Sequence, residues 1–407
     1  MASSEAAEEA AECAPASGDG TLGARAGEAA SASARRGTGG APDASLSAES
    51  KGRAEAAGRA RAAALKAFVL KNYLPLGLVL QLIVALSVPV LGRSVADVKA
   101  GDYRVCSTIL VCVIFFASGL GLKTEDIKTA VKTPLPLAYG VIAILVLTPC
   151  MSFVALEVPV KRAFQTGLAL FCCVPTTLTS GVALASQAKG NAALALLLTV
   201  SSNLLGIFTV PFALQLVLRA ASDARIDAVA LLEKLVISIL IPLAIGKAVR
   251  EASAQAQTFV KRYKTELGLL NHTCLLLVVW QTMSRSADFI KSESAENLLG
   301  VILCGVVLHL IFLVVNYALV FGVLGNYVGE KEKRTLLLLS SQKTLPVSVT
   351  IIAFLDEDVV GPTGLLAIPC VIGHMSQLFI DAVIAARWAE RDPDAAAAAD
   401  GPTLSAL

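Results

Sequence analysis

Long apolar runs alternate with short polar connections along residues 63–390 of this chain. Most of the runs are close to the length of about 20 residues that an α-helix needs to cross a bilayer, so the pattern predicts membrane-spanning helices. Ten such spans can be counted, and they define a ten-span membrane domain. Their approximate bounds are residues 74–91, 105–122, 134–156, 164–188, 192–218, 228–245, 267–283, 298–324, 335–355 and 363–386.

The segments outside this domain are polar and lack long apolar runs. Residues 1–62 are rich in Ala, Gly, Ser and Arg, so we expect a disordered N-terminal tail. This tail is a candidate plastid targeting segment, although the glutamates near its start are atypical of such peptides. Residues 391–407 are expected to form a disordered C-terminal tail.

Two predicted spans carry a polar cluster and a proline in mid-membrane. In the fourth span, Pro175 is followed by Thr176, Thr177, Thr179, Ser180 and Gly181. In the ninth span, Pro346 is preceded by Ser340, Ser341, Gln342, Lys343 and Thr344. A proline removes a backbone donor, and freed backbone groups are tolerated at this depth only where they are buried in protein or line a cavity. The pattern is typical of broken helices at a binding site.

The two broken spans lie five spans apart, which is an odd number. Two five-span halves, about residues 66–220 and 226–388, would therefore insert in opposite orientations and bring the breaks together near the midplane. We predict an all-α membrane protein with ten transmembrane helices in two inverted five-helix repeats, in which the broken helices four and nine cross.

Lys343 is the strongest single candidate for a functional residue, because inserting a lysine at the centre of the bilayer costs about 2.5–3.5 kcal/mol on insertion scales. We expect its ammonium to face a central cavity, where it would attract an anionic substrate or occupy the place of a coupling cation. The alternatives are that its stem snorkels to an interface or that it pairs with Asp381. Asp381 itself is expected to be solvated or paired with Arg387, near a helix end.

Composition and charge narrow the class of protein. Hydrophobic residues make up 55% of the chain and charged residues 16%, which excludes a soluble globular protein. Basic residues number twenty on one set of predicted loops and ten on the other, so both termini should face the cytosol or stroma. The charges lie in short clusters that give no sign of nucleic-acid binding. HExxH, GxSG and an intramembrane aspartate pair are all absent from the sequence, which argues against an enzyme.

A few further residues are candidates for specific roles. His374 lies close in sequence to Gln377 and Asp381 and is a candidate for a proton relay, since histidine titrates near neutral pH. Gly119 and Gly121 are expected to permit close packing between helices.

Four stretches resemble the bile acid:sodium symporter superfamily, in particular its branch containing the orphan seventh member of solute-carrier family ten and the plastid sodium/metabolite cotransporters. They are FFASGLGLKTEDI (115–127), CVPTTLTSGVALASQAKGN (173–191), SSQKTLPVSV (340–349) and LAIPCVIGHMSQ (366–377). The resemblance covers about residues 66–390. It implies a panel and a core domain, crossing broken helices in the core, and transport of an organic anion that is often coupled to sodium.

The resemblance also implies positions for sodium ligands. The family's serine in the fourth helix falls on Ser180, a hydroxyl of the fifth on Thr199, and the glutamine of the ninth on Gln342. The family's asparagine and glutamate positions hold Gly181 and Leu338, and both changes remove an oxygen ligand. Sodium is a hard cation that requires several oxygens, so the sequence leaves its coupling open.

We expect a secondary active transporter that moves a small organic anion by alternating access, with a sodium ion, a proton or Lys343 balancing charge. The alternative is a non-transporting membrane regulator of ion homeostasis, calcium included. The expected partners are the organic anion and the lipid bilayer, with sodium as a candidate coupling ion and no other cofactor. The plastid envelope, the plasma membrane and endomembranes all remain open as locations, and the oligomeric state leaves no signature in the sequence.

Overall fold

The computed structural model describes residues 58–70, 72–101, 103–122, 134–177, 180–222 and 226–391. Residues from Leu65 onward form one compact unit, and the residues up to Ala64 form a separate one. A helix at Gly58–Leu70 includes the end of the segment predicted as a tail. The rest of that tail, residues 392–407 and the candidate Thr179 lie outside the described residues.

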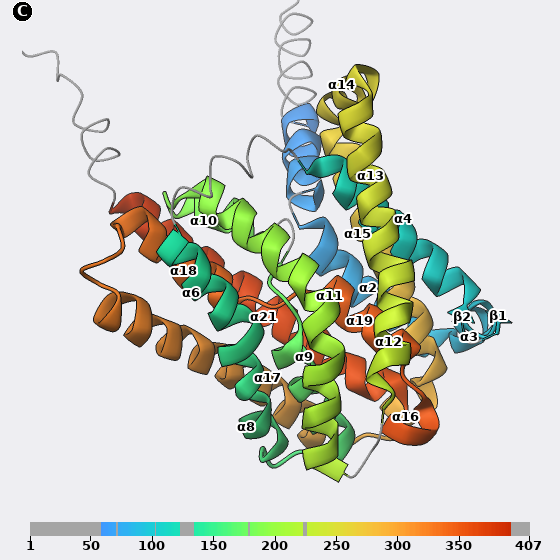
Figure 1. Ribbon diagram of the computed structural model, residues 1–407. Coiled ribbons are helices and arrows are strands. Elements are labelled where there is room, and N and C mark those ends of the chain that lie inside the picture. Colours follow the sequence, from blue (N-terminus) through green and yellow to red (C-terminus); the bar gives the residue numbers. More distant parts are fainter. Residues whose placement is uncertain are drawn as a thin grey trace, which may run out of the picture. The chain divides into compact units, whose positions relative to one another are not determined.

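The described chain is almost entirely helical (Figure 1). A short antiparallel hairpin pairs β1 (Lys99–Ala100) with β2 (Tyr103–Arg104). The helices before the first break are α2 (Tyr73–Ser87), α3 (Pro89–Ala96), α4 (Val105–Gly121), α6 (Pro134–Ile142), α7 (Thr148–Cys150), α8 (Ser152–Leu156) and α9 (Arg162–Cys173). Those that follow are α10 (Ser180–Gln187), α11 (Ala192–Ser222), α12 (Ala228–Leu235), α13 (Ile241–Ala252), α14 (Ala254–Arg262), α15 (Lys264–Arg285), α16 (Ala287–Lys291), α17 (Ala295–Tyr317), α18 (Glu330–Ser341), α19 (Leu345–Phe354), α20 (Glu357–Val360) and α21 (Thr363–Glu390).

Wider π-helical turns join several of these helices into longer rods. Ala143–Leu147 connects α6 to α7, Val236–Leu240 connects α12 to α13, and Ala318–Val323 extends α17. Such turns leave some backbone carbonyls without their usual helical partner, and they are frequent at functional sites.

Among the described residues, seven helices are long and apolar enough to cross a membrane, and Gly58–Leu70 with α2 passes the same test as a pair. The seven are Pro134–Leu156, Ala192–Ala220, Ala228–Ala252, Lys264–Arg285, Ala295–Val323, Glu330–Phe354 and Thr363–Glu390. Helix α4 is apolar but has only 17 residues, and α9 and α10 are shorter still. An all-α membrane protein is therefore confirmed, whereas the count of ten and the inverted repeats stay predictions.

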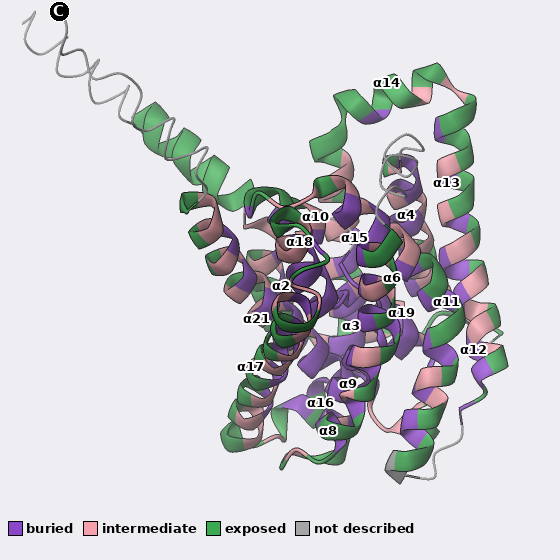
Figure 2. Cartoon of the chain, turned by 60° about the vertical axis from the view of Figure 1, so that its left-hand side comes forward, coloured by how far each residue is buried: buried purple, intermediate pink, exposed green. Residues whose placement is uncertain are grey.

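The distribution of apolar side chains fits a bilayer. Large apolar residues such as Leu216, Ile302 and Val314 are exposed on the outer faces of their helices. By contrast, 94% of the most apolar window in Glu330–Phe354 is buried inside the protein. Figure 2 shows the buried residues gathered on the central helices and the exposed ones on outer faces such as that of α17. Apolar surface of this extent is stable only against lipid or a partner.

Helices α4 and α13 approach each other through two glycines. A Cβ atom on Gly119 would clash with the backbone carbonyl of Leu243, and one on Gly246 would clash with the carbonyl of Phe116. The predicted packing role of Gly119 is therefore confirmed. The same prediction for Gly121 is wrong, because a Cβ atom there would meet nothing within 4 Å.

Gly119→Ala and Gly246→Ala should each lower the thermal unfolding midpoint of the purified protein in detergent. Backbone carbonyls cannot rotate away as a side chain can, and overpacking of this kind costs about 1–3 kcal/mol. Gly121→Ala is the matched control and should leave the midpoint unchanged. Equal midpoints for all three variants would contradict this account of the α4–α13 contact.

Candidate functional site

Both breaks predicted from sequence are present. Helix α9 ends at Cys173, and the described chain up to Thr177 is not helical. Helix α18 ends at Ser341, and α19 starts at Leu345 with Pro346 in its first turn. Proline suits this position, because the first turn of a helix needs no intrahelical donor from it. The second break therefore lies just before Pro346 rather than at it.

The two breaks lie in contact and run in opposite directions. The Thr344 amide donates to the Pro175 carbonyl over 3.0 Å. The Thr177 hydroxyl donates to Gln342 Oε1 over 2.7 Å, and the Thr176 hydroxyl donates to the Leu339 carbonyl over 2.7 Å. We call this contact the helix crossing. Backbone groups of each break are thus satisfied by groups of the other.

Lys343 lies at the crossing with its side chain fully buried. Its ammonium donates to the Val174 carbonyl over 2.8 Å, at the C-terminus of α9, and to the Ile144 carbonyl over 3.0 Å, in a π-helical turn. The C-terminus of a helix carries partial negative charge, which stabilises the cation. The prediction that this ammonium faces the cavity is wrong, and so is the alternative of a pair with Asp381.

The backbone of Lys343 is held by α21. Its amide donates to Gln377 Oε1 over 2.8 Å, and its carbonyl accepts from Gln377 Nε2. His374 Nδ1 lies 3.3 Å from the same carbonyl and 2.9 Å from Gln377 Nε2. His374 is therefore part of the crossing, while its role in a proton relay stays a prediction.

Asp381 is also part of the crossing, contrary to expectation. It is fully buried, its Oδ2 accepts from Gln342 Nε2 over 2.7 Å, and its Oδ1 lies 2.9 Å from His309 Nε2. The prediction of a solvated or Arg387-paired carboxylate is wrong because α21 continues to Glu390, well beyond Asp381. The sequence did hold a signal, since the spacing of His374, Gln377 and Asp381 places them on one helix face.

Two of the three residues aligned with sodium ligands, Gln342 and Thr199, use their polar groups in hydrogen bonds within the protein. Gln342 uses its side-chain oxygen to accept from Thr177 and its nitrogen to donate to Asp381. The Thr199 hydroxyl donates to the Thr177 carbonyl over 3.3 Å. At Gly181, the space that a larger side chain would need is filled by Thr177, Leu339 and Gln342. The buried Leu338 offers no oxygen, so the residues present do not fit a sodium ion held as in the family.

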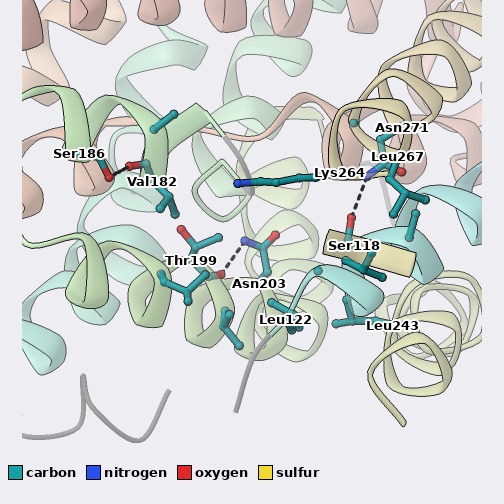
Figure 3. Close-up of a pocket in the computed structure, with 17 residues that line it drawn as sticks. Ser118, Leu122, Val182, Ser186, Thr199, Asn203, Leu243, Lys264, Leu267 and Asn271 are labelled. Atoms are coloured by element: carbon teal, nitrogen blue, oxygen red, sulfur yellow. Dashed lines mark hydrogen bonds between the residues drawn. The ribbon is translucent and has the colours of Figure 1, made fainter. Parts of the chain in front are cut away.

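A cavity of about 450 Å³ opens beside the crossing (Figure 3). It is lined by Ala117, Ser118, Gly121, Leu122, Val182, Ala183, Ser186, Leu196, Thr199, Val200, Asn203, Leu243, Val260, Lys264, Leu267, Gly268 and Asn271. Figure 3 shows the Lys264 amine reaching into the cavity between the side carrying Thr199 and Asn203 and the side carrying Ser118 and Asn271. Of the predicted binding residues that the structure describes, only Thr199 lines this cavity. Lys264 was missed because in the sequence it reads as an ordinary loop charge.

Asn203 connects the cavity with the crossing. Its Nδ2 donates to the Thr176 carbonyl over 3.0 Å and to the Thr199 carbonyl over 2.8 Å. Its Oδ1 is buried and has no hydrogen-bond partner in the described part of the chain. A buried acceptor without a partner is costly, so this oxygen is available to a donor on a bound molecule.

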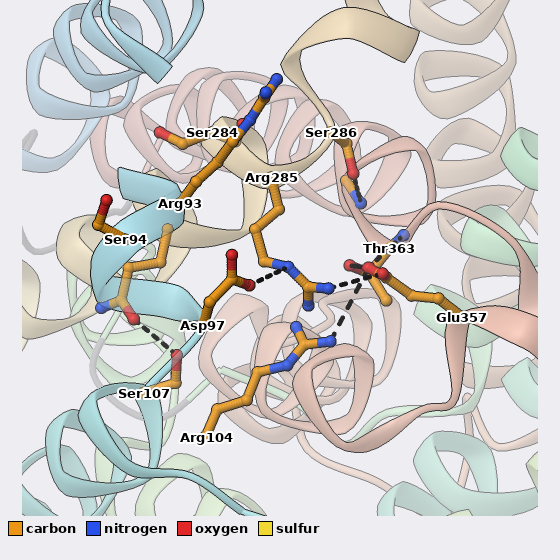
Figure 4. Close-up of polar contacts among 12 residues, drawn as sticks. Arg93, Ser94, Asp97, Arg104, Ser107, Ser284, Arg285, Ser286, Glu357 and Thr363 are labelled. Atoms are coloured by element: carbon orange, nitrogen blue, oxygen red, sulfur yellow. Dashed lines mark hydrogen bonds and ion pairs between the residues drawn. The ribbon is translucent and has the colours of Figure 1, made fainter. Parts of the chain in front are cut away.

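An ion-pair network lies at the far ends of the helices that line the cavity (Figure 4). Residues at the C-terminal end of α4 and at the N-terminal end of α15 line the cavity, whereas Arg104 precedes α4 and Arg285 is the last residue of α15. Arg285 contacts Asp97 at 3.2 Å and Glu357 at 2.8 Å, and Arg104 lies 3.8 Å from Glu357. Burial, with a smaller effect of the nearby Arg285, lowers the pKa of Arg104. We call these four residues the outer latch.

The sequence was compared with protein-family models and with curated proteins. The model of the SBF-like CPA transporter family matches residues 72–390. The chain is 40% identical over 336 residues to the probable sodium/metabolite cotransporter BASS4, chloroplastic, of Arabidopsis thaliana, covering 81% of this chain and 75% of that protein. It is 35% identical to the corresponding protein of Oryza sativa subsp. indica over 346 residues, which is 83% of this chain and 80% of that protein.

More distant relatives come from vertebrates. The sodium/bile acid cotransporter 7 of Xenopus tropicalis is 24% identical over 330 residues, which cover 77% of this chain and 90% of that protein. These matches confirm the resemblance to the bile acid:sodium symporter superfamily. Because the family model spans nearly the whole membrane domain, the chain belongs to the SBF-like CPA transporter family, whose members are transporters and not enzymes.

Proposed function

We propose that this protein moves a small organic anion across its membrane by alternating access, and that the anion binds in the cavity beside the helix crossing. The observation that carries the proposal is the position of the Lys264 amine in a cavity of about 450 Å³ that is also lined by Asn203, whose buried Oδ1 has no hydrogen-bond partner among the described residues. A cavity of that volume suits a small-molecule ligand.

The chemistry of the lining indicates the substrate class. Apolar residues supply most of the wall, and polar groups converge from Ser118, Thr199, Asn203 and Asn271. A lysine ammonium favours a carboxylate or another compact anion. The asparagine oxygen would accept a hydrogen bond from a hydroxyl on the same molecule. A carboxylate bearing a hydroxyl group and an apolar body fits these features best.

Lys343 replaces a coupling cation in this proposal. Its ammonium already supplies positive charge to the C-terminus of α9, where a bound cation would otherwise be stabilised. The relatives are named sodium cotransporters, so sodium coupling through other ligands is the second candidate. A regulator without transport activity is the less favoured alternative, because it gives no role to a ligand-sized cavity.

The proposed location is a plastid envelope, as the relative from Arabidopsis thaliana is named chloroplastic. The excess of basic residues on one set of loops supports an orientation in which both termini and the open cavity face the stroma. In that orientation the outer latch closes the opposite side, as alternating access requires when the cavity is open to the stroma.

Lys264→Gln should raise the KM for the transported anion about tenfold or more, because a hydrogen bond to a charged group contributes about 1.5–3 kcal/mol. The measurement is uptake into proteoliposomes from a panel of radiolabelled carboxylates. Lys261→Gln is the matched control, since Lys261 lies three residues earlier in the sequence, near the end of α14, and does not line the cavity. Equal KM values for both variants and wild type would exclude Lys264 from the binding site.

Glu357→Gln should weaken the outer latch and shift the protein toward the state that opens on the latch side. Hydrogen–deuterium exchange should then increase around α20 and the β1–β2 hairpin and decrease along the cavity-lining end of α15. Asp288→Asn serves as control, because Asp288 pairs with Arg93 on the same side without contacting the latch. An exchange pattern identical to wild type would show that the latch does not set the conformational equilibrium.

Sodium, potassium and choline chlorides at matched ionic strength should give the same thermal midpoint for the wild-type protein. A cation that binds only the folded state at 100 times its Kd would add about 2.7 kcal/mol, a shift that such a scan resolves. A sodium-specific rise of the midpoint for wild type would overturn the proposal that Lys343 takes the place of the cation, and it would favour a sodium symporter.

Lys343→Met should still insert in the membrane but lose transport.

A further inference from the structure

A second hollow, of about 360 Å³, lies between α17, α18 and α21. It is lined by Leu313, Val314, Tyr317, Leu337, Ile384, Arg387, Trp388 and Arg391. It shares no lining residue with the cavity beside the crossing, and no described acidic side chain lines it. We call it the lateral hollow. The proposed transport does not use it.

The lining changes from apolar to basic in one direction. Helices α17 and α21 run parallel, because His309 contacts Asp381 and, further along both helices, Phe321 lies against Trp388. Along α21, Ile384 is followed by Arg387 and then Arg391. Along α17, Leu313 and Val314 precede Tyr317. The lateral hollow therefore has an apolar end and a basic end, with the two aromatic residues at its basic half.

The lateral hollow opens toward the face that contacts lipid. Val314 is 66% exposed and Tyr317 is 55% exposed, although both lie on a helix apolar enough to span the membrane. Tyrosine and tryptophan are enriched at the level of lipid headgroups, which indicates the depth of the basic half. The apolar half consequently lies at the depth of acyl chains.

The basic end carries two arginines one helical turn apart. Both are exposed, and neither guanidinium has an ion pair or hydrogen bond with a described residue. A guanidinium presents a planar pair of donors that matches phosphate oxygens. Two such groups beside an aromatic-lined apolar slot complement an anion attached to a hydrocarbon chain.

We propose that the lateral hollow binds a phospholipid with an anionic headgroup, holding its phosphate between Arg387 and Arg391 and one acyl chain against Leu313, Val314 and Leu337. Basic pockets between membrane helices on the cytoplasmic side are suited to such lipids. The occupant would brace α18, whose last turn leads into the crossing at Ser341, against α17 and α21. Bound lipid should therefore stabilise the folded protein.

The test uses the full-length protein, delipidated in neutral detergent and titrated with phosphatidylglycerol or with phosphatidylcholine of the same acyl chains. Native mass spectrometry gives the apparent Kd for each lipid, and thermal unfolding gives the stabilisation. Wild type should bind phosphatidylglycerol about tenfold or more tightly than phosphatidylcholine, since each basic residue near a membrane surface contributes appreciably to binding anionic lipid. The thermal unfolding midpoint of wild type should rise with phosphatidylglycerol and not with phosphatidylcholine.

The double variant Arg387→Gln/Arg391→Gln should lose this preference, whereas Arg262→Gln, a charge change at the end of α14, should keep it. Val314→Trp should fill the apolar half and block the lipid while leaving both arginines in place. Because Val314 and both arginines are exposed, the lipid-free midpoints of these variants should match wild type.

Three results would overturn the proposal. The first is equal affinity of wild type for the two lipids. The second is a preference for phosphatidylglycerol that survives in the double variant or in Val314→Trp. The third is equal stabilisation by inorganic phosphate alone, which would show an anion site without a lipid.

Discussion

Backbone groups freed at the two helix breaks must find partners inside the protein, because the bilayer core offers no water. Each break provides hydrogen-bond partners for the other: the Thr344 amide donates to the Pro175 carbonyl, and the Thr176 hydroxyl donates to the Leu339 carbonyl. Lys343 satisfies two further carbonyls, at Val174 and Ile144. A buried lysine is thus part of what makes a broken helix stable at this depth, and the neighbouring helices are arranged around it.

The crossing is also connected to the proposed substrate cavity. Asn203 lines the cavity and at the same time donates to the Thr176 carbonyl, in the segment that separates α9 from α10. Lys264 reaches the same cavity from α15, on the other side. A molecule that contacts both residues therefore connects the crossing to α15. Any relative movement of the two would change its contacts, which is the differential binding that alternating access needs.

Local chemistry made much of this predictable. Proline and clustered hydroxyls marked both breaks in the sequence, and the exposed apolar faces follow from the long hydrophobic runs. The direction of the Lys343 side chain was not predictable, because it depends on a carbonyl at Ile144, far away in the chain, that is freed by a π-helical turn. Lys264 was not predicted for a different reason. Its position at a helix start gives it a loop-like sequence context, and only the structure shows that Lys264 lines the cavity.

In the proposed transport cycle, the outer latch would have to be strong enough to close one side of the protein and weak enough to open once per cycle. Arg285 bridges Asp97 and Glu357, and the side chains of Asp97 and Glu357 are 60% and 31% exposed, so solvent screens these pairs considerably. Exposed ion pairs contribute only about 0–1 kcal/mol each. Lys264 is exposed as well, so an anion held there gains an amount toward the lower end of the usual range of about 1.5–3 kcal/mol for a hydrogen bond to a charged group. The free energy of one substrate contact is thus comparable with that of the latch, so substrate binding at one end of α15 is large enough to shift the latch at the other end. It does so only if the two conformations of the protein bind the substrate with unequal affinity.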